Sequence, residues 1–132
     1  MIAETGSYAV LNGGNNFSGS QIITGSVQGN VEVITVTSAT ASIDCSKGNF
    51  FTLNLPTGST QLQATNIVPG QTISVRVDIS SSVVRTVTTN NTIKFPIGID
   101  YSPSVSSSYD LLTFVTFDTG SLYGVASTFY NK

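Results

Sequence analysis

Hydrophobic and polar residues alternate along much of the chain between residues 31 and 130. The clearest case is QTISVRVDI at 71–79, where Ile or Val occupies every odd position from 73 onward and polar residues occupy the even ones. A period of two is typical of a β-strand that buries one face. Residues 39–45 and 50–55 follow the same rule, with Cys45 in the apolar phase of the first segment. These segments therefore predict strands that cover one hydrophobic core.

Turn signals separate the alternating segments, for example SKGN at 46–49, PTGST at 56–60 and VPG at 68–70. No segment combines a 3.6-residue period with helix caps. The expected strands are 31–37, 39–45, 50–55, 61–67, 71–79, 83–89, 92–95, 110–118 and 122–130. Roughly nine short strands joined by turns predict an all-β fold, either an antiparallel β-sandwich or a jelly-roll-like barrel.

The segment DLLTFVTFD at 110–118 is apolar on both faces. Leu112 and Phe114 share one phase of the strand. The other phase holds Leu111, Val115 and Phe117. Such a strand lies between two layers or is covered by another subunit, so these last three residues form a candidate subunit interface.

Residues 1–30 have a different texture, rich in Gly, Asn and Ser, and LNGGNNFSGSQIITGSV at 11–27 carries no charge. A segment with few apolar residues cannot form a core of its own. It gains order by lying on a neighbouring subunit and adding backbone hydrogen bonds to a sheet edge. We therefore predict an extended N-terminal arm at 1–30 and a β-sandwich domain at 31–132. The candidate contact residues of the arm are Tyr8, Leu11, Phe17, Ile22 and Ile23.

The composition of the chain favours protein partners over nucleic acids. The 132 residues suffice for one domain, only 9% of them are charged, and the formal net charge is −2. A weakly charged surface suits a protein that packs against other proteins. The five basic residues do not cluster, which argues against nucleic-acid binding. No apolar run is long enough for a membrane helix, and the N-terminus lacks the pattern of a signal peptide.

Residues for catalysis or metal binding are scarce. Histidine is absent, which removes the commonest general base and metal ligand, and no phosphate-binding loop occurs. Asp100, Asp110 and Asp118 lie near the ends of expected strands, and we interpret them as turn-capping or solvated residues rather than as a catalytic pair or calcium site. Cys45 is expected to be a buried free thiol. We expect no catalytic residues, no cofactor and no metal.

The late tyrosines allow two interpretations. They can stack on sugars, or they can be half-buried residues with a solvated hydroxyl, which is the interpretation we favour. These residues are Tyr101, Tyr109, Tyr123 and Tyr130.

Five segments together resemble a β-structured module of tailed-bacteriophage virion proteins. They are SKGNFFTLNL, VPGQTISVRVDI, RTVT, IKFP and YDLLTFVTFDTGSLYGVAS, within residues 41–128. The uncharged stretch at 11–27 is similar to the extended or interwound arms of phage fibre and other virion proteins. The chain departs from this module in having no tryptophan.

The resemblance implies a non-enzymatic virion protein, and we expect a capsid decoration (cement) protein that forms a homotrimer. It would be made in the bacterial cytoplasm, sit on the capsid surface over a subunit junction, and dock arm residues 5–29 on a neighbour, with the major capsid protein as expected partner. The short length and the start at Met1 favour a free-standing protein over a fibre. The alternative is a receptor- or glycan-binding tip domain of a phage fibre, which requires exposed late tyrosines beside Asp100 or Asp110. A glycan-cleaving enzyme is a third hypothesis.

Overall fold

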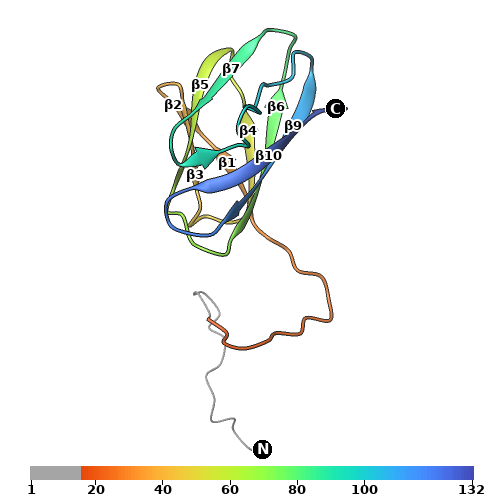
Figure 1. The fold of residues 1–132 in the computed structure, drawn as a ribbon. Helices are drawn as coiled ribbons and strands as arrows, with labels where there is room; N and C mark the ends of the chain where they lie inside the picture. The colour runs from red at the N-terminus through yellow and green to blue at the C-terminus, as the bar shows by residue number, and fades with distance from the viewer. Residues whose placement is uncertain (1–15) are drawn as a thin grey trace, which may run out of the picture.

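The computed structural model describes residues 16–132, which form ten strands in two sheets and contain no helix (Figure 1). The strands are β1 (Val31–Ile34), β2 (Val36–Thr37), β3 (Thr40–Asp44), β4 (Phe50–Asn54), β5 (Gly58–Thr65), β6 (Thr72–Ile79), β7 (Arg85–Thr89), β8 (Ile93–Lys94), β9 (Ser108–Thr116) and β10 (Leu122–Tyr130). One sheet has six strands in the order β1-β4-β6-β9-β10-β8, and the other has four in the order β2-β3-β5-β7. The prediction of an all-β fold is confirmed.

The predicted antiparallel pairing is wrong for most of the molecule, because five of the eight strand pairings are parallel. Each strand from β4 to β8 lies in the opposite sheet to the strand that precedes it in the chain. Consecutive strands of one sheet are thus joined through a strand of the other, and they run in the same direction. The result is a curled, mixed arrangement (Figure 1). Alternation along the sequence predicts which face a strand buries, but not which strand it pairs with.

Both sheets contribute to a single hydrophobic core. The inward residues of β6 are completely buried, as its alternation predicts. Cys45 is buried with a free thiol, as expected. The fully or almost fully buried apolar residues include Ala41, Ile43, Leu53, Leu62, Ile73, Val75, Val77, Ile79, Leu112, Phe114 and Leu122.

Two expected strands have different bounds in the structure. The segment 31–37 divides at Thr35, so that β1 joins the six-stranded sheet and β2 the four-stranded one. The turn expected at 56–60 is shorter, because β5 already begins at Gly58, which has a φ of 90°. Only glycine adopts that conformation at low cost, so Gly58 turns the chain directly into the strand.

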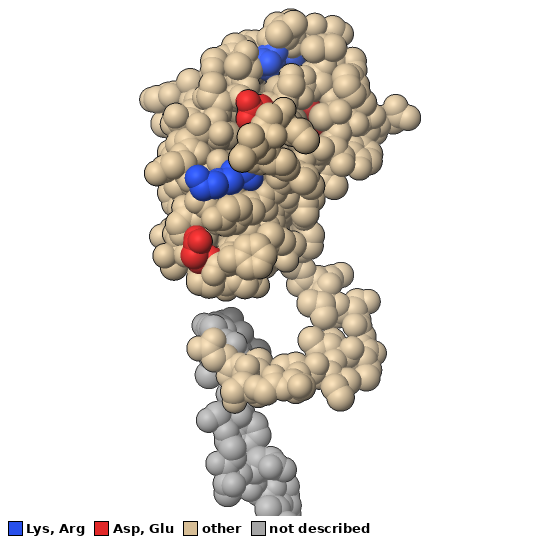
Figure 2. Space-filling model, viewed as in Figure 1, with Lys and Arg blue, Asp and Glu red and all other residues tan. Residues whose placement is uncertain are grey.

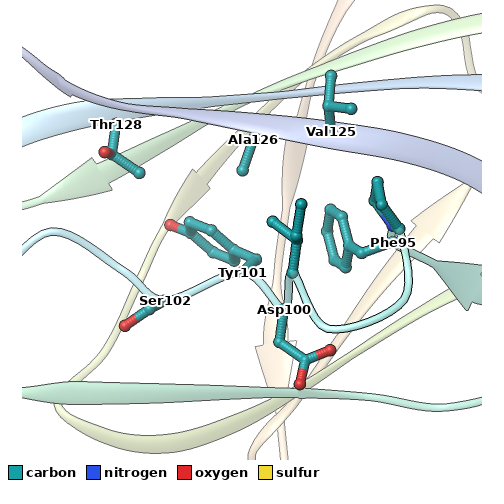
Figure 3. Close-up of a pocket in the computed structure, with 9 residues that line it drawn as sticks. Phe95, Asp100, Tyr101, Ser102, Val125, Ala126 and Thr128 are labelled. Atoms are coloured by element: carbon teal, nitrogen blue, oxygen red, sulfur yellow. The ribbon is translucent and has the colours of Figure 1, made fainter.

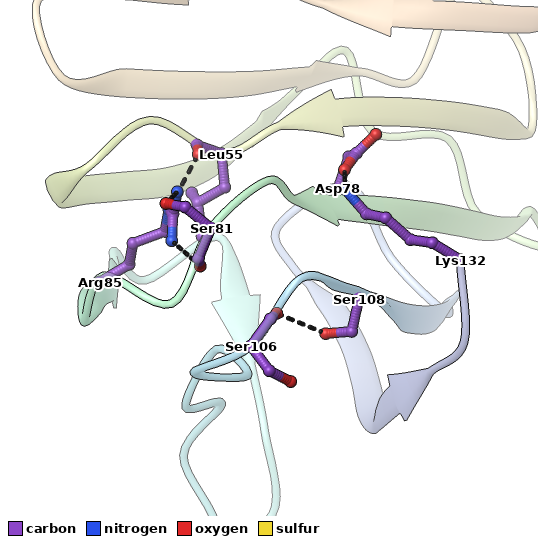
Figure 4. A network of polar contacts seen from close by, with 7 residues as sticks. All are labelled: Leu55, Asp78, Ser81, Arg85, Ser106, Ser108 and Lys132. Carbon is purple, nitrogen blue, oxygen red and sulfur yellow. Dashed lines mark hydrogen bonds and ion pairs between the residues drawn. The ribbon is translucent and has the colours of Figure 1, made fainter.

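Polar contacts fasten the loops that connect the sheets (Figure 4). The buried guanidinium of Arg85 donates to the carbonyl oxygens of Leu55 at 3.1 Å, Ser81 at 3.1 Å and Val83 at 2.8 Å. These carbonyls replace the water that the cation loses on burial. At the C-terminus, Lys132 forms an ion pair with Asp78 of β6. These contacts hold the loop after β6 and the chain end against the sheets.

Two buried threonines give a matched test of the packing. Thr60 is 1% exposed and its hydroxyl has no hydrogen-bond partner among the described residues, whereas the hydroxyl of Thr116 accepts from the backbone N–H of Gln71 at 2.8 Å. Removing an unpaired buried hydroxyl relieves a desolvation cost, so we expect Thr60→Val to raise the free energy of unfolding by about 1 kcal/mol. Thr116→Val should lower it by about 1–3 kcal/mol. Urea unfolding measures both, and equal effects of the two substitutions would contradict this assignment.

Candidate interaction surface

The outer face of β9 and β10 carries an apolar stripe, which we call the β9–β10 face. It consists of Leu111, Val115, Phe117, Tyr123 and Val125, all exposed to solvent. Val115 pairs with Tyr123 in the sheet, and the ring centroids of Phe117 and Tyr123 lie 6.1 Å apart. Phe117 is 76% exposed. The structure thus places the three residues of the predicted subunit interface on one exposed surface and adds two residues of β10 to them.

The outer face of the four-stranded sheet is entirely different. Its strands alternate inward residues, most of them apolar, with outward polar ones. The outward residues are Thr40, Ser42, Asp44, Ser59, Gln61, Gln63, Thr65, Thr86 and Thr88. Charged side chains are few and scattered on the side of the molecule shown in Figure 2. An exposed apolar patch confined to one sheet is typical of a surface that binds another protein.

The described part of the arm, residues 16–30, is exposed along its whole length and forms no strand. It runs away from the sheets, as the red to orange segment in Figure 1 shows. Phe17, Ile22 and Ile23 are exposed, while Tyr8 and Leu11 lie outside the described residues. The arm meets the body at Gly29, where an added Cβ would lie 2.6 Å from the ring of Phe50. A side chain at this position would have to displace the ring of Phe50, which is exposed to solvent.

Asp110 of β9 is completely buried, and its carboxylate accepts four hydrogen bonds. The donors are the Tyr101 hydroxyl at 2.8 Å, the backbone N–H of Ser104 at 2.8 Å, the Ser104 hydroxyl, and the backbone N–H of Phe129 at 3.1 Å. Burial and the neighbouring carboxylate raise the pKa of Tyr101, which keeps its hydroxyl protonated as a donor. The interpretation of Asp110 as a turn-capping or solvated residue is therefore wrong, because its carboxylate is buried within β9 and bonds to the loop and to β10.

This carboxylate also explains the irregular end of β10. Ser127 pairs with Leu111 and Tyr130 with Tyr109, so two residues of β10 lie opposite Asp110 alone. This arrangement is a β-bulge. Phe129 has a φ of 67°, and its N–H leaves the sheet ladder to reach the carboxylate.

A pocket of 320 Å³ lies between β10 and the loop that follows β8 (Figure 3). Phe95 and Tyr101 line it from the loop, and Ala126 lines it from β10. In Figure 3 the side chain of Ala126 points towards Tyr101, while the carboxylate of Asp100 points away from β10. The lining is mainly apolar.

The four late tyrosines do not form one exposed cluster beside Asp100 or Asp110. Tyr101 is the one that lines a pocket with Asp100, and it is buried. The ring of Tyr109 lies under the guanidinium of Arg76, 4.6 Å from its centroid, and Tyr123 belongs to the β9–β10 face. The arrangement that a glycan-binding head requires is thus not present in residues 16–132.

The remaining candidate groups have local roles. Asp118 accepts from the backbone N–H groups of Gly120 and Ser121 at 2.7 and 3.1 Å, which is turn capping as interpreted from the sequence. Burial and the nearby charge of Asp44 raise the pKa of Cys45 to about 11, so the thiol is unreactive at neutral pH. Within residues 16–132, no three His, Cys, Asp or Glu side chains lie close enough to hold a metal ion.

Comparisons with protein-family models, curated proteins and solved structures found no match to this chain. No helix in residues 16–132 is long and apolar enough to cross a membrane.

Sequence reasoning missed Tyr123 and Val125 as members of the β9–β10 face. The signal was present, because LYGVASTFY places Tyr123, Val125 and Ser127 in one phase. This alternation indicates a shared surface only once β10 is known to pair with β9, because that pairing places Tyr123 beside Val115 and Val125 beside Thr113.

The role of Asp110 is testable with three substitutions. Asp110→Asn places an amide N–H₂ group against donors, and we expect it to lower the free energy of unfolding by about 3 kcal/mol. Tyr101→Phe removes one of the four donors and should lower it by about 1–2 kcal/mol. Tyr109→Phe is the control, since the Tyr109 hydroxyl has no such contact among the described residues. Chemical unfolding measures all three variants. An unchanged free energy of unfolding in Asp110→Asn would show that the buried carboxylate is dispensable for stability.

The β9–β10 face is testable by a charge placed at its most exposed residue. We expect the full chain to self-associate and Phe117→Asp to weaken that association by at least about tenfold, because the charge must be desolvated in the contact. Thr86→Asp adds the same charge to the outer face of the four-stranded sheet and should have no effect. Sedimentation at several concentrations measures the masses. Equal association of both variants with the parent chain would exclude this face as the subunit interface.

Proposed function

We propose that this chain is a non-enzymatic structural protein of a tailed-bacteriophage particle, a decoration (cement) protein bound to the capsid surface. The observation that carries the proposal is the combination of the apolar β9–β10 face with an exposed, uncharged arm segment at 16–30 on one small body. Both features serve contact with other proteins. The resemblance of residues 41–128 to modules of phage virion proteins supplies the biological setting.

In the proposed mechanism the two sheets form a sandwich-like body that lies over a junction between capsid subunits. The β9–β10 face joins copies of the chain, with a homotrimer as the expected assembly. The arm, including Phe17, Ile22 and Ile23, docks on a neighbouring subunit, and the major capsid protein is the expected partner of the assembly. Few charges need to be desolvated when these surfaces are buried, which favours such contacts.

The fibre-tip alternative has less support. It needs an exposed aromatic cluster beside a carboxylate, whereas Tyr101 is buried against Asp110 and the other described tyrosines contact other partners or solvent. The pocket beside β10 has an aromatic lining, but the carboxylate of Asp100 points away from β10 (Figure 3).

The test is immunogold electron microscopy on phage particles purified from cells that carry the gene. Antibodies against the recombinant chain should label the capsid surface at many regularly spaced positions. Particles made without the gene should remain unlabelled and release their DNA at a lower temperature, because a cement protein stabilises the shell by binding its assembled form. Label at the fibre tips would support the alternative. Absence of the chain from washed particles would refute a virion role.

A further inference from the structure

The six-stranded sheet has an open edge beyond β8. This strand has two residues, and it pairs with β10 only at Leu122 and Tyr123. The N–H of Leu122 donates to the carbonyl of Thr92 at 2.8 Å, towards that edge. Backbone groups of alternate residues in a strand point to the same edge, so those of Gly124 and Ala126 do so as well.

Pro96 ends the pairing between β8 and β10. If the parallel ladder continued, the next donor would be the N–H of residue 96, and proline has none. The chain turns away there, with the N–H of Ile99 donating to the carbonyl of Pro96 at 2.9 Å. The pairing of β8 with β10 ends at Tyr123, so no residue of β8 pairs with Ala126. The backbone N–H and C=O of Ala126 face the open edge without a partner in β8.

The pocket of 320 Å³ lies along this edge. We call it the β10 edge groove, lined by Phe95, Pro96, Ile99, Tyr101, Val125 and Ala126. The loop supplies apolar and aromatic side chains, and β10 supplies unpaired backbone groups (Figure 3). Apolar side-chain contacts beside a free strand edge are the requirements for binding an extended peptide as an added strand.

The arm has the chemistry that this groove requires. Residues 20–28 carry no charge, and every one of them is exposed. As a strand, this segment places Ile23 and Val27 on one face, together with Gln21 and Gly25. The other face holds Ile22, Thr24 and Ser26. An uncharged strand whose inward face carries Ile23 and Val27 enters an apolar groove without desolvating a charge.

We propose that the β10 edge groove receives residues 21–27 of the arm of a second copy of this chain, as a strand added to β10. The inference rests on the proposed function only in using the arm as a docking segment. The arm that enters the groove belongs to a second copy, because each arm leaves its own body far from β10. It leaves at Gly29, next to β1, and β1 and β10 lie at opposite ends of a run of five strands in the sheet. Four strand spacings separate them, about 19 Å.

This placement makes the contact between copies head-to-tail. Donor arm and acceptor groove are different surfaces, so each copy can give an arm to one neighbour and accept an arm from another. Such contacts form a ring when the rotation between copies closes, and the expected homotrimer is one such ring. Val125 both lines the groove and belongs to the β9–β10 face, so the two contact regions are continuous.

The test uses the full chain and two adjacent substitutions in the arm that add the same charge. Val27→Asp puts the charge on the face that enters the groove, and Ser26→Asp puts it on the face that points away. We expect the full chain to be an oligomer by light scattering, with the Ala126 amide protected from hydrogen exchange by NMR. Val27→Asp should reduce the oligomer and speed exchange of that amide by at least about tenfold. Ser26→Asp should change both by less than about twofold.

Two other outcomes would overturn the inference. A monomer with a protected Ala126 amide would show that the arm occupies the groove of its own chain. An oligomer in which this amide exchanges freely would show an empty groove, while leaving oligomer formation through the β9–β10 face intact. Neither outcome depends on whether the chain is found in phage particles, so the inference and the proposed function can fail separately.

Discussion

The buried carboxylate of Asp110 is the constraint on which the C-terminal part of the molecule depends. It lies on β9 but bonds to the loop through Tyr101 and Ser104 and to β10 through Phe129. Each hydrogen bond to a charged group contributes about 1.5–3 kcal/mol, and together they offset the cost of burying the charge. One carboxylate thereby holds both walls of the β10 edge groove, since Tyr101 lines the loop side and the bulge at Phe129 ends the regular part of β10.

The two sheets share one core but present unlike surfaces. The chain passes from one sheet to the other at almost every strand up to β8, so both sheets form from the same stretch of sequence. Their outer faces still diverge, because the four-stranded sheet exposes Ser, Thr and Gln, while β9 and β10 expose Leu111, Val115 and Val125. Polar outward residues keep the first face in water. The apolar residues of the second are stabilised when another protein covers them.

The sequence predicts much of the local structure, because burial of one strand face leaves a direct mark on residue order. The alternation at 71–79 correctly identifies the buried side of β6. The double phase at 110–118 corresponds to a strand that buries Leu112 and Phe114 and exposes Leu111 and Val115, and coverage of the exposed side by another subunit stays a prediction. Pairing depends instead on contacts between distant segments, so neither the parallel strand pairings nor the division at Thr35 could be predicted. The groove could not be predicted for the same reason. In the sequence Pro96 predicts only a turn. Its effect on the sheet edge follows from the pairing of β8 with β10, which the sequence does not show.

The arm and the β9–β10 face act as parts of one attachment surface in this scheme. A strand added at the open edge of β10 lies next to Val125, one strand spacing away, about 4.8 Å. Once an arm is bound, the neighbour that donates it is held close, and contact through the face becomes an intramolecular event at high effective concentration. Two contacts of modest strength then hold copies together more tightly than either does alone. A chain with so few charged residues can therefore assemble without any single large interface.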